Sequence, residues 1–270
     1  MTHNNHKHKK RLVSIISMNM MLTSALLGII IGTVIFDCIF LYQRSLSHVV
    51  VTKATNIQHA IGPKEIVHGD RSKKQVIFTF DAGGGVQSGD KVLSVLAKHH
   101  VKGTFFMTGK FVEANPLFVR KVADAGNEIF NHTYDHPHLP TLTNAEIVSE
   151  LDKMNAILAS TTPSVSEGIS TDLSAKPFFR PPYGDRDARV IETAYKNGYE
   201  DVYWTVDAGD WEQPTGMTAT EVEDKILSNL ASGNIFLMHI GDDITGQVLD
   251  QVFTAIENKG YKIVSLTQGL

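Results

Sequence analysis

The chain of 270 residues carries a net charge of −4, and residues 44–270 hold 21 of its 25 Lys and Arg residues against 28 of its 29 Asp and Glu residues, a net charge of −7. This acidic balance argues against nucleic acid as a partner. Cys38 is the only cysteine, so the residues beyond it cannot form an internal disulfide and depend on a hydrophobic core. The residues from Gln75 onward suffice for one domain with such a core.

Residues 1–11 predict a cytoplasmic tail, and the segment that follows predicts a transmembrane helix. From Leu12 to Phe36 there are 25 residues without a charge, a helix of about 37 Å that exceeds a bilayer core of about 30 Å. The run is preceded by Lys7, Lys9, Lys10 and Arg11, which the positive-inside rule assigns to the cytoplasm. We therefore expect a single-pass anchor over residues 12–43 in the cell membrane, with the remaining chain outside the cytoplasm.

Two alternatives stay open for this segment. A cleaved signal peptide competes with the anchor, but the apolar run exceeds the usual core of about 7–15 residues and no A-x-A cleavage site closes it. Gly28 and Gly32 form a G-x-x-x-G pattern that would let two spans pair into a homodimer. Such pairs of small residues are also frequent in membrane helices that do not associate.

Residues 44–74 are mostly polar around one short apolar run, Val49–Val51, and this composition indicates a stalk. Beyond it, short apolar runs alternate with helical patterns, which is typical of parallel βα units. The predicted strands are 76–80, 103–107, 128–130, 177–179, 201–206, 234–238 and 262–265. Seven such units favour a barrel, although an open doubly wound sheet fits the spacing nearly as well.

Helix start signals separate the predicted strands. Thr143 with Glu146, and Thr220 with Glu223, match the pattern of a capping box. The Ser/Thr-rich stretch 160–174 precedes the fourth predicted strand and is expected to be a surface loop.

Five clusters of charged, histidine and aromatic residues begin at or just after the C-terminal ends of predicted strands. They are Thr79–Gly83, Asn131–Pro137, Arg180–Gly184, Asp207–Trp211 and Leu237–His239. Barrels built from βα units carry their catalytic residues at this end of the strands. Clusters that lie far apart in the sequence are therefore expected to meet in one site.

In this order the clusters resemble the five motifs of the NodB-type polysaccharide deacetylases, carbohydrate esterase family 4, which read roughly TFDDG, H-[ST]-x-x-H, R-x-P-[YF]-G, D-x-x-D-W and L-x-H. The resemblance covers residues 75–270. It implies an α/β fold, a distorted (β/α)7–8 barrel, here behind an N-terminal transmembrane helix. It also implies a hydrolase that acts on linear amide C–N bonds.

His132 and His136 are four residues apart, so on a helical turn they would face the same side and could bind one metal ion. An isolated pair of this spacing is more often a pair of polar loop residues, because catalytic zinc sites need about three protein ligands. The resemblance implies that both are metal ligands, for Zn²⁺ in the first place and for Co²⁺ or Mn²⁺ as alternatives.

The resemblance also implies roles in amide hydrolysis for the other clusters. Asp81 matches the base that takes a proton from water, and Arg180 matches the residue that orients this base. His239 matches the general acid that protonates the leaving nitrogen, and Asp210 the carboxylate that keeps the imidazolium charged. The backbone N–H of Tyr183 matches the group that stabilises the oxyanion.

Three further residues are expected to line the site. Asp207 could share the task of Asp210, and Trp211 and Leu237 match positions that form the walls of the acetyl pocket. Loop caps, structural ion pairs and ordinary core packing remain alternative interpretations for the side chains in all five clusters.

The resemblance fails at Ala82, where the family has an aspartate that acts as the third metal ligand. With two histidines alone, metal affinity should drop unless Asp81, Asp135, His138 or another carboxylate takes its place. Asn127, where many relatives have histidine, is a lesser departure.

The sequence thus predicts a membrane-anchored enzyme that removes N-acetyl groups from amino sugars of a cell-envelope polysaccharide, peptidoglycan in the first place. Chitin-like oligomers, an exopolysaccharide and an O-acetyl ester of xylan are alternative substrates. A carbohydrate-binding pseudoenzyme that has lost the metal is the main rival, and Ala82 is its only support in the sequence.

Overall fold

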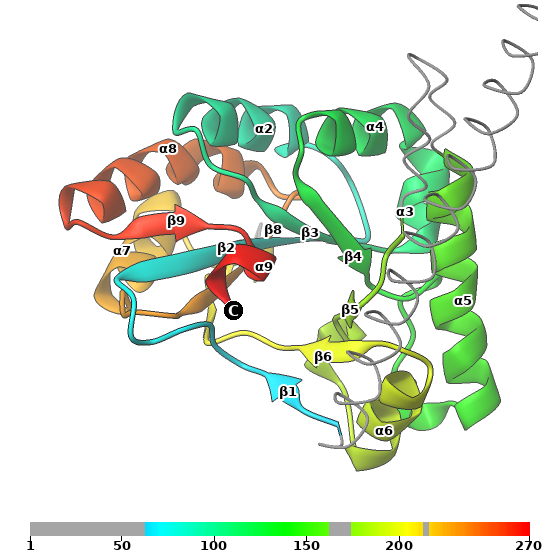
Figure 1. Ribbon diagram of the computed structural model, residues 1–270. Helices are drawn as coiled ribbons and strands as arrows, with labels where there is room; N and C mark the ends of the chain where they lie inside the picture. Colours follow the sequence, from blue (N-terminus) through cyan, green and yellow to red (C-terminus); the bar gives the residue numbers. More distant parts are fainter. Residues whose placement is uncertain (1–62, 162–173, 213–215) are drawn as a thin grey trace, which may run out of the picture. The chain divides into compact units, whose positions relative to one another are not determined.

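The computed structural model describes residues 63–161, 174–212 and 216–270 (Figure 1). The predicted membrane anchor, with Gly28 and Gly32, lies outside these residues, and so does most of the predicted loop 160–174. Within the three described stretches, no helix combines the length and hydropathy needed to cross a bilayer.

In the described part of the chain, the strands form one parallel sheet in the order β1-β6-β5-β4-β3-β2-β8-β7, and β9 adds to the beginning of β2. The strands are β1 (Glu65–Ile66), β2 (Gln75–Ala82), β3 (Thr104–Met107), β4 (Glu128–Asn131), β5 (Phe178–Phe179), β6 (Glu200–Val202), β7 (Val206–Asp207), β8 (Ile235–His239) and β9 (Lys262–Val264). The parallel α/β architecture predicted from the sequence is therefore confirmed.

The sheet curls into an incompletely hydrogen-bonded barrel. The predicted strand 201–206 is split into β6 and β7, because the link between them passes from one end of the sheet to the other. In this link Tyr203 N–H donates to the Ile66 carbonyl of β1, and Thr205 N–H donates to the Ile235 carbonyl of β8. β1 has no counterpart among the predicted strands and lies within the segment 44–74 that the sequence suggests as a stalk.

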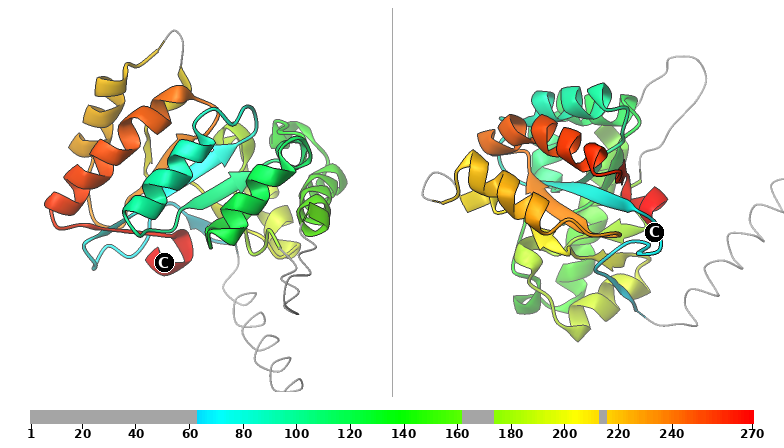
Figure 2. Two further views of the ribbon diagram at one scale, coloured as in Figure 1. Left: turned by 90° about the horizontal axis from the view of Figure 1, so that it is seen from above. Right: turned by 90° about the vertical axis from the view of Figure 1, so that its left-hand side faces the viewer.

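Apart from the short C-terminal helix, whose Leu266 packs inside the barrel, the helices of the described residues cover the outside of the curled sheet (Figure 2). The helices are α2 (Gly89–Lys98), α3 (Gly109–Ala114), α4 (Pro116–Asp124), α5 (Asn144–Thr161), α6 (Ala188–Lys196), α7 (Ala219–Ser228), α8 (Asp243–Asn258) and α9 (Leu266–Gly269), with 3-10 turns η1 (Leu139–Thr141), η2 (Pro182–Gly184) and η3 (Asp210–Glu212). The capping box of Thr143 and Glu146 is present. The second box starts α7 two residues earlier than predicted, with Thr218 and Glu221.

The described residues form three apolar clusters, and two of them separate the inside of the barrel from its outside. The inner cluster takes residues from successive strands around the ring and from α9: Ile66, Ile77, Phe106, Phe130, Phe178, Val202, Ile235 and Leu266. The outer cluster packs the sheet against the helices. Burial of both clusters supplies the main stabilising free energy of a domain that has no disulfide.

The alternation along β2 decides which side chains reach the site. Ile77 belongs to the inner cluster, whereas Phe78, Phe80 and Ala82 belong to the outer one. Because successive side chains of a strand point to opposite faces, Asp81 shares the inner face with Ile77. Ala82 has 1% of its surface exposed, and its side chain packs among apolar residues.

Candidate active site

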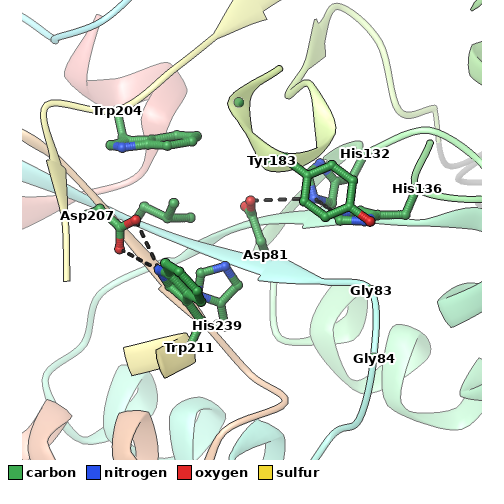
Figure 3. A pocket seen from close by; sticks show the side chains of 12 residues that line it. Asp81, Gly83, Gly84, His132, His136, Tyr183, Trp204, Asp207, Trp211 and His239 are labelled. Carbon is green, nitrogen blue, oxygen red and sulfur yellow. Dashed lines mark hydrogen bonds and ion pairs between the residues drawn. The ribbon is translucent and has the colours of Figure 1, made fainter. Parts of the chain in front are cut away.

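The predicted clusters meet at the C-terminal ends of the strands, around a cavity of about 490 Å³ (Figure 3). Its walls are formed by Asp81, Gly83, Gly84, His132, His136, Tyr183, Gly184, Trp204, Asp207, Trp211, Leu237 and His239. Arg180 and Asp210 do not line it; both are fully buried behind residues that do. Trp204 is a lining residue that the sequence analysis missed, since it falls within a predicted strand and outside the recognisable motifs.

Asp81 is held by a buried arginine. Arg180 Nη1 donates to Asp81 Oδ1 at 2.7 Å and to Thr79 Oγ1 at 2.9 Å. The rest of the guanidinium is bound by backbone oxygens, with Nε donating to Val202 and Nη2 to Tyr203. Burial alone would raise the pKa of Asp81, but the positive charge and hydrogen bond of Arg180, together with the nearby His132 and His239, outweigh burial and hold this pKa below its usual value. Asp81 is therefore ionised at neutral pH.

His239 forms a hydrogen-bonded pair with Asp210 on the other side of the cavity. His239 Nδ1 lies 3.0 Å from Asp210 Oδ1, and the backbone N–H of His239 donates to Asp210 Oδ2 at 2.7 Å. The hydroxyl of Thr245, in the first turn of α8, also donates to Asp210 Oδ2. Burial acts to lower the pKa of His239, but the hydrogen bond and negative charge of Asp210, together with the charges of Asp81 and Asp207, outweigh burial and raise this pKa to about 9. The imidazole is therefore charged at neutral pH.

His132 and His136 converge, but not on a helical turn, so the prediction of a helix at this pair is wrong. The segment after β4 is an irregular turn in which Thr133 and His136 have left-handed φ values of 65° and 60°. Such values are strained for non-glycine residues. They are held by Asn131 Oδ1, which accepts from Thr133 N–H, and by Thr133 Oγ1, which accepts from His136 N–H.

The two imidazoles are arranged as metal ligands would be. His132 Nδ1 donates to the Arg180 carbonyl oxygen at 2.8 Å, which leaves the lone pair on Nε2. His132 Nε2 and His136 Nε2 lie 3.2 Å apart. Two ligands of a tetrahedral Zn²⁺, each at about 2.0–2.1 Å, would lie about 3.3 Å apart. Burial lowers the pKa of His132. Burial and the neighbouring His132 lower the pKa of His136 to about 4. Both rings are therefore neutral at pH 7, as metal binding requires.

The described residues offer no complete set of ligands, because no group of three or more His, Cys, Asp or Glu side chains among them is arranged to hold an ion. Of the candidate substitutes, Asp135 pairs with Lys110 and His138 pairs with Asp185. Asp81 alone of the three lies beside the histidines, with Oδ2 3.5 Å from His132 Nε2. The site thus fits two histidine ligands and lacks a third.

Aromatic residues border the mouth of the cavity. The Tyr183 ring lies between His136, with ring centres 4.4 Å apart, and His138, on which it stacks at 4.2 Å. Trp211 is 52% exposed, which excludes the interpretation as a core residue, whereas Leu237 is buried. Trp211 Nε1 donates to Asp207 Oδ2 at 3.1 Å. Asp207 therefore orients this indole, and it acts on His239 only as a more distant negative charge.

The buried pair of His239 and Asp210 generates a pH prediction. We expect His239 to titrate near pH 9 in the folded protein, and the Asp210→Asn variant to titrate well below that, since its amide cannot stabilise the imidazolium. Because the folded pKa exceeds the unfolded value of about 6.5, the stabilisation by this pair is complete below pH 6.5 and is lost as the pH rises through 9.

An NMR titration of the histidine ring protons measures both pKa values directly. Asp224→Asn, which removes an exposed carboxylate from α7, is the matched control and should leave His239 unchanged. Equal His239 pKa values in wild type and Asp210→Asn would contradict the assignment.

Comparison with known proteins agrees with this geometry. The sequence profile of the family described as Polysaccharide deacetylase matches residues 68–202. The chain is 34% identical to the uncharacterized protein YlxY of Bacillus subtilis over 84% of this chain and 66% of YlxY. It is 30% identical to the peptidoglycan-N-acetylmuramic acid deacetylase PdaA of the same organism, over 83% of this chain and 82% of PdaA.

A solved structure with a related fold is that of wild-type BA3943 from Bacillus anthracis, described as a CE4 family pseudoenzyme. Its TM-score is 0.68 at 30% identity, over 77% of this chain and 69% of that chain. A mutant of BA3943 is described as having restored enzymatic activity. The matched profile spans half of this chain and includes the clusters of Asp81, His132 and Arg180. The chain therefore belongs to the NodB-type polysaccharide deacetylases, carbohydrate esterase family 4, a family of metal-dependent hydrolases.

Proposed function

We propose that this protein is a polysaccharide deacetylase that removes N-acetyl groups from amino sugars of a cell-wall glycan, peptidoglycan in the first place. The observation that carries the proposal is the placement of an ionised carboxylate opposite a charged imidazole in one cavity. Asp81 and His239 are register partners on adjacent strands, β2 and β8, and both side chains line the cavity. Hydrolysis of an amide needs one group that accepts a proton and one that donates a proton.

In the proposed mechanism, Asp81 accepts a proton from the attacking water while Arg180 holds its carboxylate in place. His239 donates its proton to the leaving nitrogen, and Asp210 keeps the imidazole charged and oriented until that step. A divalent ion held by His132 and His136 would supply a Lewis acid that polarises the acetyl carbonyl and activates the water. The family's third ligand is absent from position 82, so we expect such an ion to be weakly held.

The substrate and the location are proposed from the relatives and the N-terminal sequence. PdaA is named as a peptidoglycan deacetylase, which favours a cell-wall glycan over the other substrates considered. The uncharged run 12–36 behind four basic residues favours an anchor in the cell membrane, with the barrel outside the cytoplasm and close to the wall.

A carbohydrate-binding pseudoenzyme is the second candidate, and two observations favour it. Ala82 is buried in the outer apolar cluster where the family has a metal ligand, and BA3943, with a TM-score of 0.68, is described as a pseudoenzyme. In this case the cavity would bind an acetylated glycan without cleaving it.

The proposed acid–base pair predicts the effects of two substitutions. Asp81→Asn and His239→Ala should each reduce acetate release from N-acetylglucosamine oligomers or peptidoglycan by about 10²–10⁴-fold while leaving the circular dichroism spectrum unchanged. The matched control is His100→Ala, because His100 is exposed and lies outside the cavity. Turnover at the wild-type rate in either cavity variant would refute the assigned role.

The missing ligand predicts the behaviour of Ala82→Asp. Without metal, the new carboxylate would be buried among apolar groups, so this variant should unfold at a lower temperature than wild type. Zn²⁺, Co²⁺ or Mn²⁺ should then raise its melting temperature more than that of wild type, because an anionic ligand completes the site.

A thermal-shift titration with each ion tests this expectation, with Ala82→Asn as the control that has nearly the same shape but no charge. An equally large metal response in wild type would mean that another residue supplies the third ligand. No metal response and no acetate release in wild type and Ala82→Asp would favour the pseudoenzyme.

The proposed anchor predicts an intact N-terminus. Mass spectrometry of the protein isolated from membranes should find peptides that begin within residues 1–11, because an uncleaved span retains its cytoplasmic tail. A mature protein that begins near Arg44 or later would show that the segment is a cleaved signal peptide.

A further inference from the structure

One wall of the cavity is built from two chain segments packed tightly against each other. Tyr183 and Gly184 form the first segment, and Trp204, on which Tyr203 stacks, forms the second. The rings of Tyr203 and Trp204 stack with centres 3.8 Å apart and planes 15° apart. Gly184 has a φ of +67°, and a Cβ atom there would lie 2.7 Å from each of these two rings. Only glycine allows this close approach.

Arg186 contacts both segments from behind the wall. Its guanidinium carbon lies 3.6 Å from the centre of the Tyr203 ring, and its Nη1 donates to the Gly184 carbonyl at 2.9 Å. The same side chain is bound by Glu65 of β1 and lies 3.5 Å from Asp201 Oδ2 of β6. None of these contacts involves Asp81 or His239, so the proposed mechanism gives Arg186 no role.

The two carboxylates that hold Arg186 form an unusual arrangement. Glu65 and Asp201 are register partners on β1 and β6. Asp201 is almost fully buried, and neither of its carboxylate oxygens has a hydrogen-bond partner among the described residues. Burial and the neighbouring Glu65 raise the pKa of Asp201 to about 8. A buried carboxyl group without a hydrogen-bond partner lowers stability, so its placement beside the cavity wall is the more informative feature.

We propose that Arg186 is a positioning residue for glycan binding. It holds the stacked rings of Tyr203 and Trp204 against Gly184, so that the Trp204 side of the cavity presents a fixed aromatic wall to an amino-sugar ring. The C–H faces of a pyranose ring pack on such a surface, and a rigid wall spares the cost of ordering it on binding. This inference rests on the proposed function only in that the cavity takes a glycan, and it holds equally for a non-catalytic binder.

The first test measures glycan binding without catalysis. The full chain is titrated with N-acetylglucosamine oligomers in the presence of chelator, with tryptophan fluorescence as the readout. Arg186→Gln should weaken binding about fivefold or more and reduce the near-ultraviolet circular dichroism of the Tyr203–Trp204 stack, with the far-ultraviolet spectrum unchanged. Arg189→Gln is the matched control, because Arg189 lies three residues further on and contacts Asn144 and Pro140 instead.

Two more variants test whether Arg186 acts through the stack. Arg186→Lys keeps the positive charge beside Glu65 but loses the planar face on Tyr203, so its affinity should fall between wild type and Arg186→Gln. In a double-mutant cycle with Tyr203→Leu, the double variant should bind no more weakly than whichever single variant has the lower affinity. Full rescue by lysine, or additive losses in the cycle, would overturn a role through Tyr203.

The outcomes also separate this inference from the proposed function. If wild type binds the oligomers and Arg186→Gln binds them equally well, the positioning role is overturned while the proposed function stands. If wild type binds no acetylated oligomer or peptidoglycan fragment, the glycan-binding function fails and the inference fails with it.

Discussion

The buried guanidinium of Arg180 is the interaction on which the rest of the site depends. Its nitrogens reach Asp81 and Thr79 on β2 and the carbonyls of Val202 and Tyr203 at the end of β6. Its own carbonyl accepts a hydrogen bond from the ring of His132. A fully buried positive charge is tolerated only when it is paired and hydrogen-bonded. The contacts that satisfy this charge therefore also hold the carboxylate of Asp81, one of the two convergent histidines and the start of the Tyr203–Trp204 segment.

The pKa values of Asp81 and His239 are shifted in opposite directions, so the two sides of the cavity differ in charge. Arg180 keeps Asp81 ionised, whereas Asp210 keeps His239 protonated, so the cavity holds a proton acceptor and a proton donor at the same pH. Two titratable groups whose environments push their pKa values apart are the usual arrangement for acid–base chemistry. The histidine pair differs from both, since burial keeps its rings neutral.

The apolar strands were sufficient to predict a parallel α/β fold and the meeting of the five clusters at one edge, whereas the choice of a curled barrel over an open sheet came mainly from the resemblance of the motifs. The ends of strands and the residues of a motif depend on neighbours that are close in the sequence, so they can be predicted from one sequence. The irregular turn from His132 to His136 was missed because its left-handed residues are held by side-chain hydrogen bonds, which the spacing of two histidines does not reveal. β1 was missed because two residues carry no periodic pattern and become a strand only by pairing with β6.

We expect the alanine at position 82 to affect metal-dependent hydrolysis but not recognition of the sugar, two properties that the family resemblance implies together. An aspartate at position 82 would be buried where Ala82 now packs among apolar residues, so a charge at this position requires an ion to compensate its burial. The aromatic wall and Arg186 lie in the β6–β7 link and in the loop after η2, and they do not depend on position 82. Loss of the third ligand would therefore weaken metal binding and hydrolysis while leaving recognition of a sugar ring intact. A change of this kind would allow a barrel to pass from catalysis to binding without rebuilding its cavity.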